Sequence, residues 1–160
     1  MMPDPEDLDK AFELFRGRLK PFIGQLASLP LATFAGLRVK EISVHHCVVS
    51  LPGGWRTQNP FRSTYWAAQG MAAEMACGVI PYGYVRASTV PIRMILAGSS
   101  ARFVKMCKTP SLFTCESGQV VSNAMAETLE TGQSVTCPMT CVGIDAHGDT
   151  ISEWTFNWSF

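Results

Sequence analysis

The sequence is short of charge. Of its 160 residues, 13 are Lys or Arg and 13 are Asp or Glu, so only 16% are charged, whereas 47% are hydrophobic. The two signs cancel, which leaves no positive surface of the kind that binds nucleic acid or an anionic membrane. A chain of this length suits one domain, over residues 1–160, with one substantial core. So much apolar surface must be hidden, and we therefore expect self-association, as a homodimer or a dimer of dimers.

Long apolar runs are also missing. No stretch is long enough to span a bilayer. The first ten residues, MMPDPEDLDK, are acidic and lack the basic and apolar regions of an export signal. We therefore expect a cytoplasmic protein. In that compartment the cysteines are most simply reduced core thiols; they are Cys47, Cys77, Cys107, Cys115, Cys137 and Cys141.

Metal ligands are equally scarce. The chain has three histidines, two of which, His45 and His46, are adjacent. Its one close cysteine pair, Cys137 and Cys141, lies in the segment CPMTC, which is not a C-x-x-C motif. These residues do not assemble a convincing zinc site. We expect no metal and no cofactor.

Helical patterns are found at the start of the chain. Asp4 and Pro5 are typical of a helix N-terminus, with an N-cap followed by proline at the first helical position. Apolar residues then recur at helical spacing at Leu8, Phe12, Phe15 and Leu19. We expect an N-terminal helical segment over residues 4–29, interrupted at Pro21.

Strand patterns follow. Residues 36–52 predict a β-hairpin, because β-branched residues cluster there and the alternation slips phase at His45-His46, where a turn fits. Residues 90–98 and 101–107 are two further strand-like runs.

The C-terminal part carries the clearest strand signal. Residues 119–130 predict a short amphipathic helix closed by Gly132. Residues 134–144 and 150–160 flank a turn, and aromatic side chains alternate strictly along the second run at Trp154, Phe156, Trp158 and Phe160. Residues 89–160 therefore supply the rest of a sheet.

The central helix, expected over residues 59–78 (NPFRSTYWAAQGMAAEMACG), is apolar on nearly every side. A helix of this kind must be enclosed. We therefore predict an α+β fold in which a curved antiparallel sheet of about five to six strands wraps around this long helix, with an extra helix at the N-terminus.

One acid, Glu74, lies in the middle of that helix. Its neighbours on the helix surface are mostly small, with Ala67 and Gly70 before it and Gly78 after it. A carboxylate in apolar surroundings has either a partner or a raised pKa, and a raised pKa suits a general base. The alternative is an ion pair with an arginine across an interface. For Tyr65 and Gln69, on the same helix, ordinary hydrogen bonding in the core is the alternative to substrate binding.

The segment resembles the central helix of hotdog-fold proteins, in particular the acyl-CoA thioesterases of the phenylacetate-pathway and 4-hydroxybenzoyl-CoA type. That group has a loop amide, then a His-Gly-Gly-like helix start, then an acid about two turns later and a glycine. On this sequence Asn59 matches the amide, Tyr65-Trp66-Ala67 the helix start, Glu74 the acid and Gly78 the glycine. The resemblance covers roughly residues 30–160 and is closest to a poorly characterised, thioesterase-like branch.

The resemblance implies a thioester hydrolase whose partners are an acyl-CoA, or a similar thioester, and a second copy of the chain. Glu74 would activate water or attack directly, the backbone N–H of Trp66 would stabilise the oxyanion, and Asn59 would position the carbonyl or the water. Coenzyme A carries phosphates, for which the candidate cations are Arg93, Arg102, Lys105 and Lys108; the alternative is that they form a solvated strand face. Arg62, in the loop before the helix, is a further candidate for substrate contact.

The sequence departs from the family at the helix start. Trp66 stands where the family has glycine, and Tyr65 stands where it has histidine. These replacements favour the alternative of a non-catalytic acyl-binding or structural dimer.

Related hydratases and dehydratases fit less well. Thr57 and Arg62 replace the aspartate and histidine that a hydratase needs, and a dehydratase needs a histidine near the acid, whereas none is close to Glu74 in the sequence.

Overall fold

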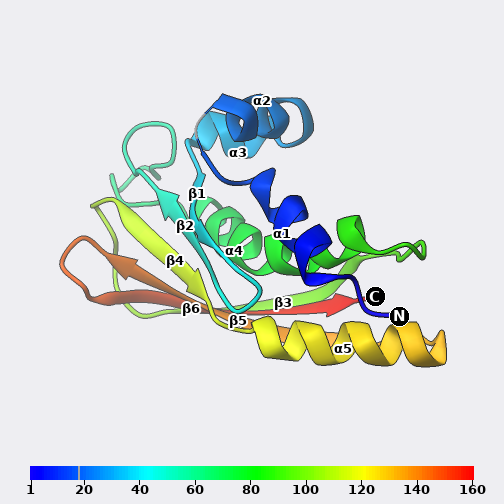
Figure 1. The fold of residues 1–160 in the computed structure, drawn as a ribbon. Helices are drawn as coiled ribbons and strands as arrows, with labels where there is room; N and C mark the ends of the chain where they lie inside the picture. Colours follow the sequence, from blue (N-terminus) through cyan, green and yellow to red (C-terminus); the bar gives the residue numbers. More distant parts are fainter. Residues whose placement is uncertain (18) are drawn as a thin grey trace.

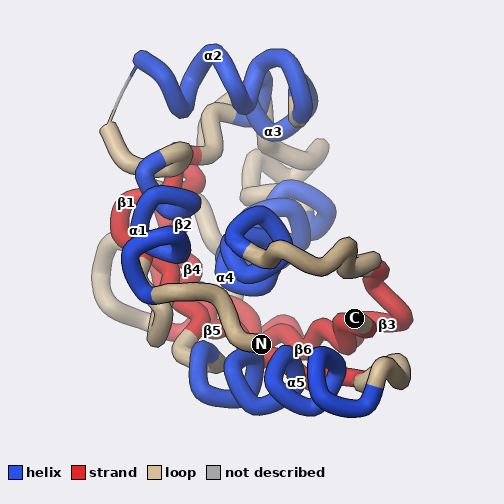
Figure 2. The backbone as a smooth tube through the Cα atoms, turned by 45° about the vertical axis from the view of Figure 1, so that its right-hand side comes forward, coloured by secondary structure: helices blue, strands red, loops and turns tan. Residues whose placement is uncertain are grey.

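The computed structural model describes residues 1–17 and 19–160, without the side chains of residues 19–22 and 26. Its core is a six-stranded antiparallel sheet in the order β1-β2-β4-β5-β6-β3, curved around the long helix α4, which spans Trp66–Ala87 (Figures 1 and 2). The strands are β1 (Arg38–Ile42), β2 (Cys47–Leu51), β3 (Ile95–Phe103), β4 (Ser111–Cys115), β5 (Thr136–Asp145) and β6 (Thr150–Ser159). The α+β hotdog fold predicted from the sequence is confirmed.

The aromatic alternation along β6 positions the helix. Trp154, Phe156 and Trp158 all lie on the inner face and are buried. A Cβ on Gly70 would lie 3.1 Å from the ring of Trp154, and one on Gly78 would lie 3.1 Å from the ring of Trp158. The small residues of α4 therefore let this chain's own tryptophans approach the helix.

The central helix was expected over residues 59–78, but it begins at Trp66 and continues through Pro81 to Ala87. Gly78 has no left-handed backbone conformation and so does not cap the helix. The continuation packs against α1 (Pro5–Glu13), where Phe12 contacts Gly83. This burial outweighs the low helix propensities of glycine and proline.

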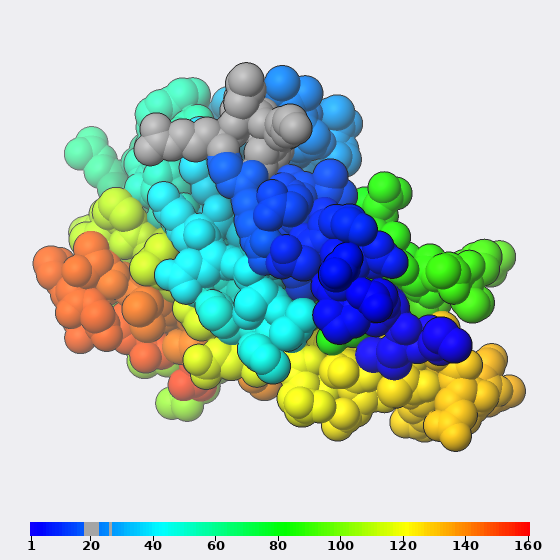
Figure 3. Space-filling model, in the orientation of Figure 1, coloured from blue at the N-terminus to red at the C-terminus, as the bar shows by residue number. Residues whose placement is uncertain are grey.

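The N-terminal segment forms three helices, α1, α2 (Leu19–Ser28) and α3 (Pro30–Ala35). The main break lies after Glu13, near Gly17 with its φ of +89°, and Pro21 lies within α2. The side chain of Leu19, expected on the apolar face of the first helix, is outside the described residues. On the face drawn in Figure 3, α1 lies beside the hairpin β1–β2.

Two strand-like runs were expected over residues 90–98 and 101–107, but a single strand, β3, spans parts of both. The short strand β4 was missed; it pairs with β2 and β5 and buries Phe113 between them. Helix α5 (Gly118–Thr131) ends at Gly132, whose φ of +68° forms the expected left-handed cap.

All six cysteines are buried free thiols. Three of them lie side by side across neighbouring strands, since Cys115 is the register partner of both Cys47 and Cys141, and Cys77 of α4 faces Cys115 and Cys141. Among the helices of the described residues, none combines the length and apolarity that a membrane crossing needs.

Candidate functional site

The loop before α4 is organised by Asn59. Its Oδ1 accepts hydrogen bonds from the backbone N–H of Phe61 at 3.0 Å and from the N–H and hydroxyl of Ser63 at 3.2 and 3.1 Å. Arg62, at the tip, has a φ of +58° and is exposed. The carbonyl oxygen of the Asn59 side chain is thus engaged within the loop, so only its NH₂ group can face a substrate.

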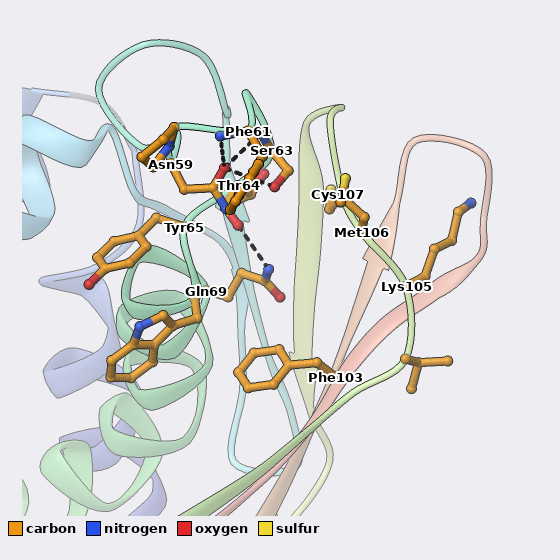
Figure 4. Close-up of a pocket in the computed structure, with 13 residues that line it drawn as sticks. Asn59, Phe61, Ser63, Thr64, Tyr65, Gln69, Phe103, Lys105, Met106 and Cys107 are labelled. Atoms are coloured by element: carbon orange, nitrogen blue, oxygen red, sulfur yellow. Dashed lines mark hydrogen bonds between the residues drawn. The ribbon is translucent and has the colours of Figure 1, made fainter.

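A groove of about 480 Å³ lies between this loop and the segment after β3. Its wall combines the loop, the first residues of α4 and residues 103–107. Figure 4 shows Gln69 and Phe103 pointing into the groove, whereas the Tyr65 ring points away and the Lys105 side chain extends toward the β5–β6 turn. The groove is therefore an apolar and amide-lined surface at the start of the central helix.

Trp66 is the first residue of α4 and is 57% exposed. Its ring makes an edge-to-face contact with Tyr65, with the centroids 5.8 Å apart. No side chain caps this helix terminus. The N–H groups of a first helical turn have no acceptor within the helix, and the helix dipole is positive there, so the turn can stabilise a negatively charged oxygen.

Gln69 belongs to a buried hydrogen-bond chain. Its Nε2 donates to the Thr64 carbonyl at 3.3 Å, and its Oε1 accepts from the Ser152 hydroxyl at 2.8 Å. Ser152 Oγ in turn accepts from the indole N–H of Trp154 at 2.9 Å. The amide of Gln69 thus joins the start of α4 to β6. This is the hydrogen bonding in the core that the sequence offered as the alternative to substrate binding.

Glu74 is half-buried in the middle of α4. Its Oε1 lies 3.3 Å from the point where a Cβ on Gly78 would be, and Cζ2 of Trp158 lies 3.1 Å from the same point. Burial raises the pKa of the Glu74 carboxyl above its usual 4.5. Within the described part of one chain, this carboxyl has no hydrogen bond or ion pair, so the arginine partner is not found there.

The residues expected to act together are not all neighbours. Asn59, Tyr65, Trp66 and Gln69 line the groove, and Glu74 does not. Trp66 and Glu74 are eight positions apart in the helix, which at 1.5 Å per residue is about 12 Å along its axis. A single carbonyl group cannot touch the Trp66 N–H and the Glu74 carboxyl of the same chain.

Two of the four candidate cations, Arg102 and Lys105, are paired with acids. Arg102 lies 3.3 Å from Glu153 on the neighbouring strand. Lys105 contacts Asp145 at 2.9 Å and also contacts Asp149. Hydrogen bonds to Asp149 and Asp145 raise the pKa of Lys105 to about 12, and the bond from Lys105 lowers the pKa of Asp145 to about 2. The charge of Lys105 is therefore already neutralised by the two acids at the β5–β6 turn.

A serine, a histidine and an acid also meet at the β1–β2 turn. Ser43 Oγ lies 3.0 Å from His46 Nδ1, and His46 Nε2 lies 3.2 Å from Glu41. However, Ser43 Oγ accepts the backbone N–H groups of His45 and His46 at 3.2 and 3.1 Å. Its lone pairs are thus engaged in shaping the turn, which is unlike the free oxygen of an activated nucleophile.

Across residues 1–17 and 19–160, no three His, Cys, Asp or Glu side chains are placed to hold a metal ion.

The structure also brings in residues that the sequence did not single out as functional. Phe103 lines the groove, and Trp158 lies beside Glu74. The alternation of β6 placed Trp158 on the inner face, but only the fold shows which helix residue it faces.

A family model described as "Domain of unknown function (DUF4442)" matches residues 23–159. None of the curated proteins is significantly similar to this chain in sequence.

Solved structures share the fold. A Pseudomonas aeruginosa protein described as a probable thioesterase has a TM-score of 0.72 and 18% identity, over 99% of this chain and 96% of its own. A Haemophilus influenzae thioesterase has a TM-score of 0.66 and 10% identity, over 91% of this chain and 92% of its own. A Chlorobaculum tepidum protein of unknown function has a TM-score of 0.74 and 11% identity, over 88% of this chain and 91% of its own. At such identities the likeness establishes the fold alone, and it does not distinguish the phenylacetate-pathway and 4-hydroxybenzoyl-CoA branch.

Proposed function

Because this chain belongs to the family described as "Domain of unknown function (DUF4442)" and has a hotdog fold, we propose that it hydrolyses a thioester, either an acyl-CoA or a similar acyl-carrier thioester. The observation that carries the proposal is the half-buried Glu74 in the middle of the enclosed helix, which has a raised pKa and no partner among the described residues. Two of the structural relatives are described as thioesterases, which supports the reaction class.

In this proposal Glu74 is the general base or the nucleophile. As a base it takes a proton from water while the water oxygen bonds to the thioester carbon. The C–S bond then breaks, and the proton passes to the departing sulfur, which gives a carboxylic acid and a thiol. A carboxyl whose pKa is raised toward neutral pH accepts that proton more readily than an ordinary carboxylate does.

The first turn of α4 supplies the oxyanion donor. The backbone N–H of Trp66 has no acceptor within the helix and lies at the positive end of the helix dipole. Since Trp66 and Glu74 of one chain are too far apart to share a carbonyl group, we propose that the helix start of one copy acts with the Glu74 of another. The NH₂ group of Asn59 would then orient the carbonyl or the water.

The open edge of the sheet suits such a dimer. β3 is the last strand of the sheet, and its residues are almost all exposed, including Ile95 at 66%. Leu96 of this strand is the register partner of Trp158, which lies beside Glu74. A second copy paired along β3 would continue the sheet, cover these apolar residues and approach the acid.

The groove would hold part of the substrate. Tyr65 and Gln69 come from the start of α4, and the amide of Gln69 is already used by Thr64 and Ser152, so its role is to fix the groove wall. Arg62 is exposed in the loop beside the groove and can reach a carrier phosphate. At Arg102 or Lys105 a phosphate would have to compete with the paired acids.

A binding protein without hydrolysis is the second candidate. Trp66 favours it, because its indole stands at the helix start where the resembling thioesterases have glycine, and this bulk restricts approach to the N–H. The test is hydrolysis of short, long and aromatic acyl-CoA thioesters by the wild type and by Glu74→Gln. Hydrolysis that needs Glu74 supports the enzyme. Binding of these thioesters without turnover supports the second candidate.

A further inference from the structure

A buried donor without an acceptor lies on β6. The indole N–H of Trp158 has no hydrogen-bond partner among the described residues, and the side chain is only 7% exposed. Trp154, on the same face of the same strand, donates its indole N–H to Ser152. Buried N–H groups are rarely left unpaired, because they lose their hydrogen bonds to water, so the unpaired indole of Trp158 indicates a conditional partner.

Glu74 is placed to be that partner. The carboxyl oxygen Oε1 and the ring atom Cζ2 of Trp158 lie 3.3 and 3.1 Å from one point, where Gly78 has no side chain. In an indole, Cζ2 and Nε1 are attached to the same ring carbon, so the N–H lies on the same edge of the ring. The carboxyl of Glu74 and this donor therefore border the same space beside Gly78.

We infer that the indole N–H of Trp158 donates a hydrogen bond to the ionised carboxylate of Glu74 and holds it in position. Its catalytic consequence rests on the proposed thioester hydrolysis, whereas the pairing itself does not. Burial raises the pKa of Glu74 by disfavouring the charged form, and a donor that contacts only that form lowers the pKa again. The pair would thus set the pH at which the base becomes available.

Other titratable groups near the pair are thiols. Cys137 is the register partner of Trp158 on β5, and burial raises its pKa to about 11. On α4, the pKa of Cys77 is raised, chiefly by its hydrogen bonds with Cys115 and Cys141. On β4, the hydrogen bond from Cys77 is the main cause that lowers the pKa of Cys115 to about 7. Because its pKa is lowered, the effect of Cys115 must be separated from that of Glu74.

Among the described buried residues of α1, α3, α5, β2 and β3, the further titratable group is Cys47. The buried residues of α1, α3 and α5 are apolar or glycine. On β2 the buried titratable group is Cys47, and burial raises the pKa of its thiol. On β3 the neighbour of Trp158 is Leu96.

Proton–nitrogen NMR spectra of the four indole N–H groups test the pairing without any activity assay. We expect the Trp158 signal to move with pH along a single titration curve, and to lose that movement in Glu74→Gln. The Trp154 signal should stay fixed in both proteins. A Trp158 signal that ignores pH in the wild type, or that still titrates in Glu74→Gln because it follows Cys115, overturns the inference.

The catalytic consequence is tested by Trp158→Phe, with Trp154→Phe as the matched control. Losing the donor should shift the acid limb of the pH–rate profile to higher pH by about one unit. The control removes an indole from the same strand and should leave the limb in place. If the acid limb of the Trp158→Phe profile lies at the same pH as that of the wild type, the positioning role is overturned. If the wild type hydrolyses no thioester, the proposed function fails, and the NMR titration still decides whether the two residues pair.

Discussion

Gly83 of α4 lies so close to Phe12 of α1 that a Cβ on Gly83 would be 2.3 Å from Cε1 of the ring. Phe12 is fully buried, so the ring has no free space to enter. We expect Gly83→Ala to destabilise the protein by about 1–3 kcal/mol, the usual effect of overpacking a core. Urea unfolding measures this change.

A matched control is available in α2. An alanine Cβ at Gly24 would meet no described atom within 4 Å, so Gly24→Ala should stabilise the protein by up to about 1 kcal/mol through helix propensity. If Gly83→Ala is as stable as Gly24→Ala, the contact between α1 and α4 is not as close as described.

The buried amide of Gln69 is structural. Gln69→Leu leaves the Thr64 carbonyl without its donor and the Ser152 hydroxyl without its acceptor. The expected loss of stability is about 1–3 kcal/mol. Gln119→Leu, which removes an exposed amide bonded to Asn123, should change stability by no more than about 0.5 kcal/mol. Equal effects of the two substitutions would contradict the buried hydrogen-bond chain.

The edge strand β3 predicts how two copies associate. Ile95→Lys places a charge on this edge and should convert a dimer into a monomer at micromolar concentration, which halves the mass measured by light scattering. Leu112→Lys, at an exposed position of the interior strand β4, should remain dimeric. A monomeric wild type would rule out both the dimer and the shared site.

The raised pKa of Glu74 has a consequence for stability. The folded protein holds the Glu74 proton at a pH where the unfolded chain has lost it, so the wild type loses stability as pH rises above the usual 4.5 and through the folded-state pKa. Glu74→Gln has no such loss. Its melting temperature should therefore match the wild type below pH 4.5 and exceed it increasingly at higher pH. A variant that melts lower at neutral pH would point to a cationic partner from another copy.

The sequence was sufficient for the fold because its two strongest signals are local. A helix without a polar face must be enclosed, and the strict alternation from Trp154 to Phe160 can only be a strand with one buried face. The predicted end of the helix at Gly78 was wrong. Gly78 is small because the ring of Trp158 packs against it, and Trp158 is distant in the sequence. β4 was missed because its residues, SLFTC, include no Val or Ile, unlike those of the equally short β1 and β2.

The site was only partly accessible from the sequence. The apolar surroundings of Glu74 follow from helical geometry, and its raised pKa follows from them. The hydrogen bond between Gln69 and Ser152 joins residues 83 positions apart, and no local pattern predicts it. The same holds for the closeness of Trp158 to Glu74, since the register of β6 under α4 is set by the whole fold.

The central claim is that Glu74 acts on the thioester. The most direct measurement is acyl-CoA hydrolysis by the wild type and by Glu74→Gln at matched concentrations of folded dimer. Gln keeps the shape of the side chain but cannot accept the proton, so we expect the rate to fall by roughly 10²-fold or more while the dimer and the fold remain. A Glu74→Gln protein that hydrolyses the same thioesters at the wild-type rate would contradict the account.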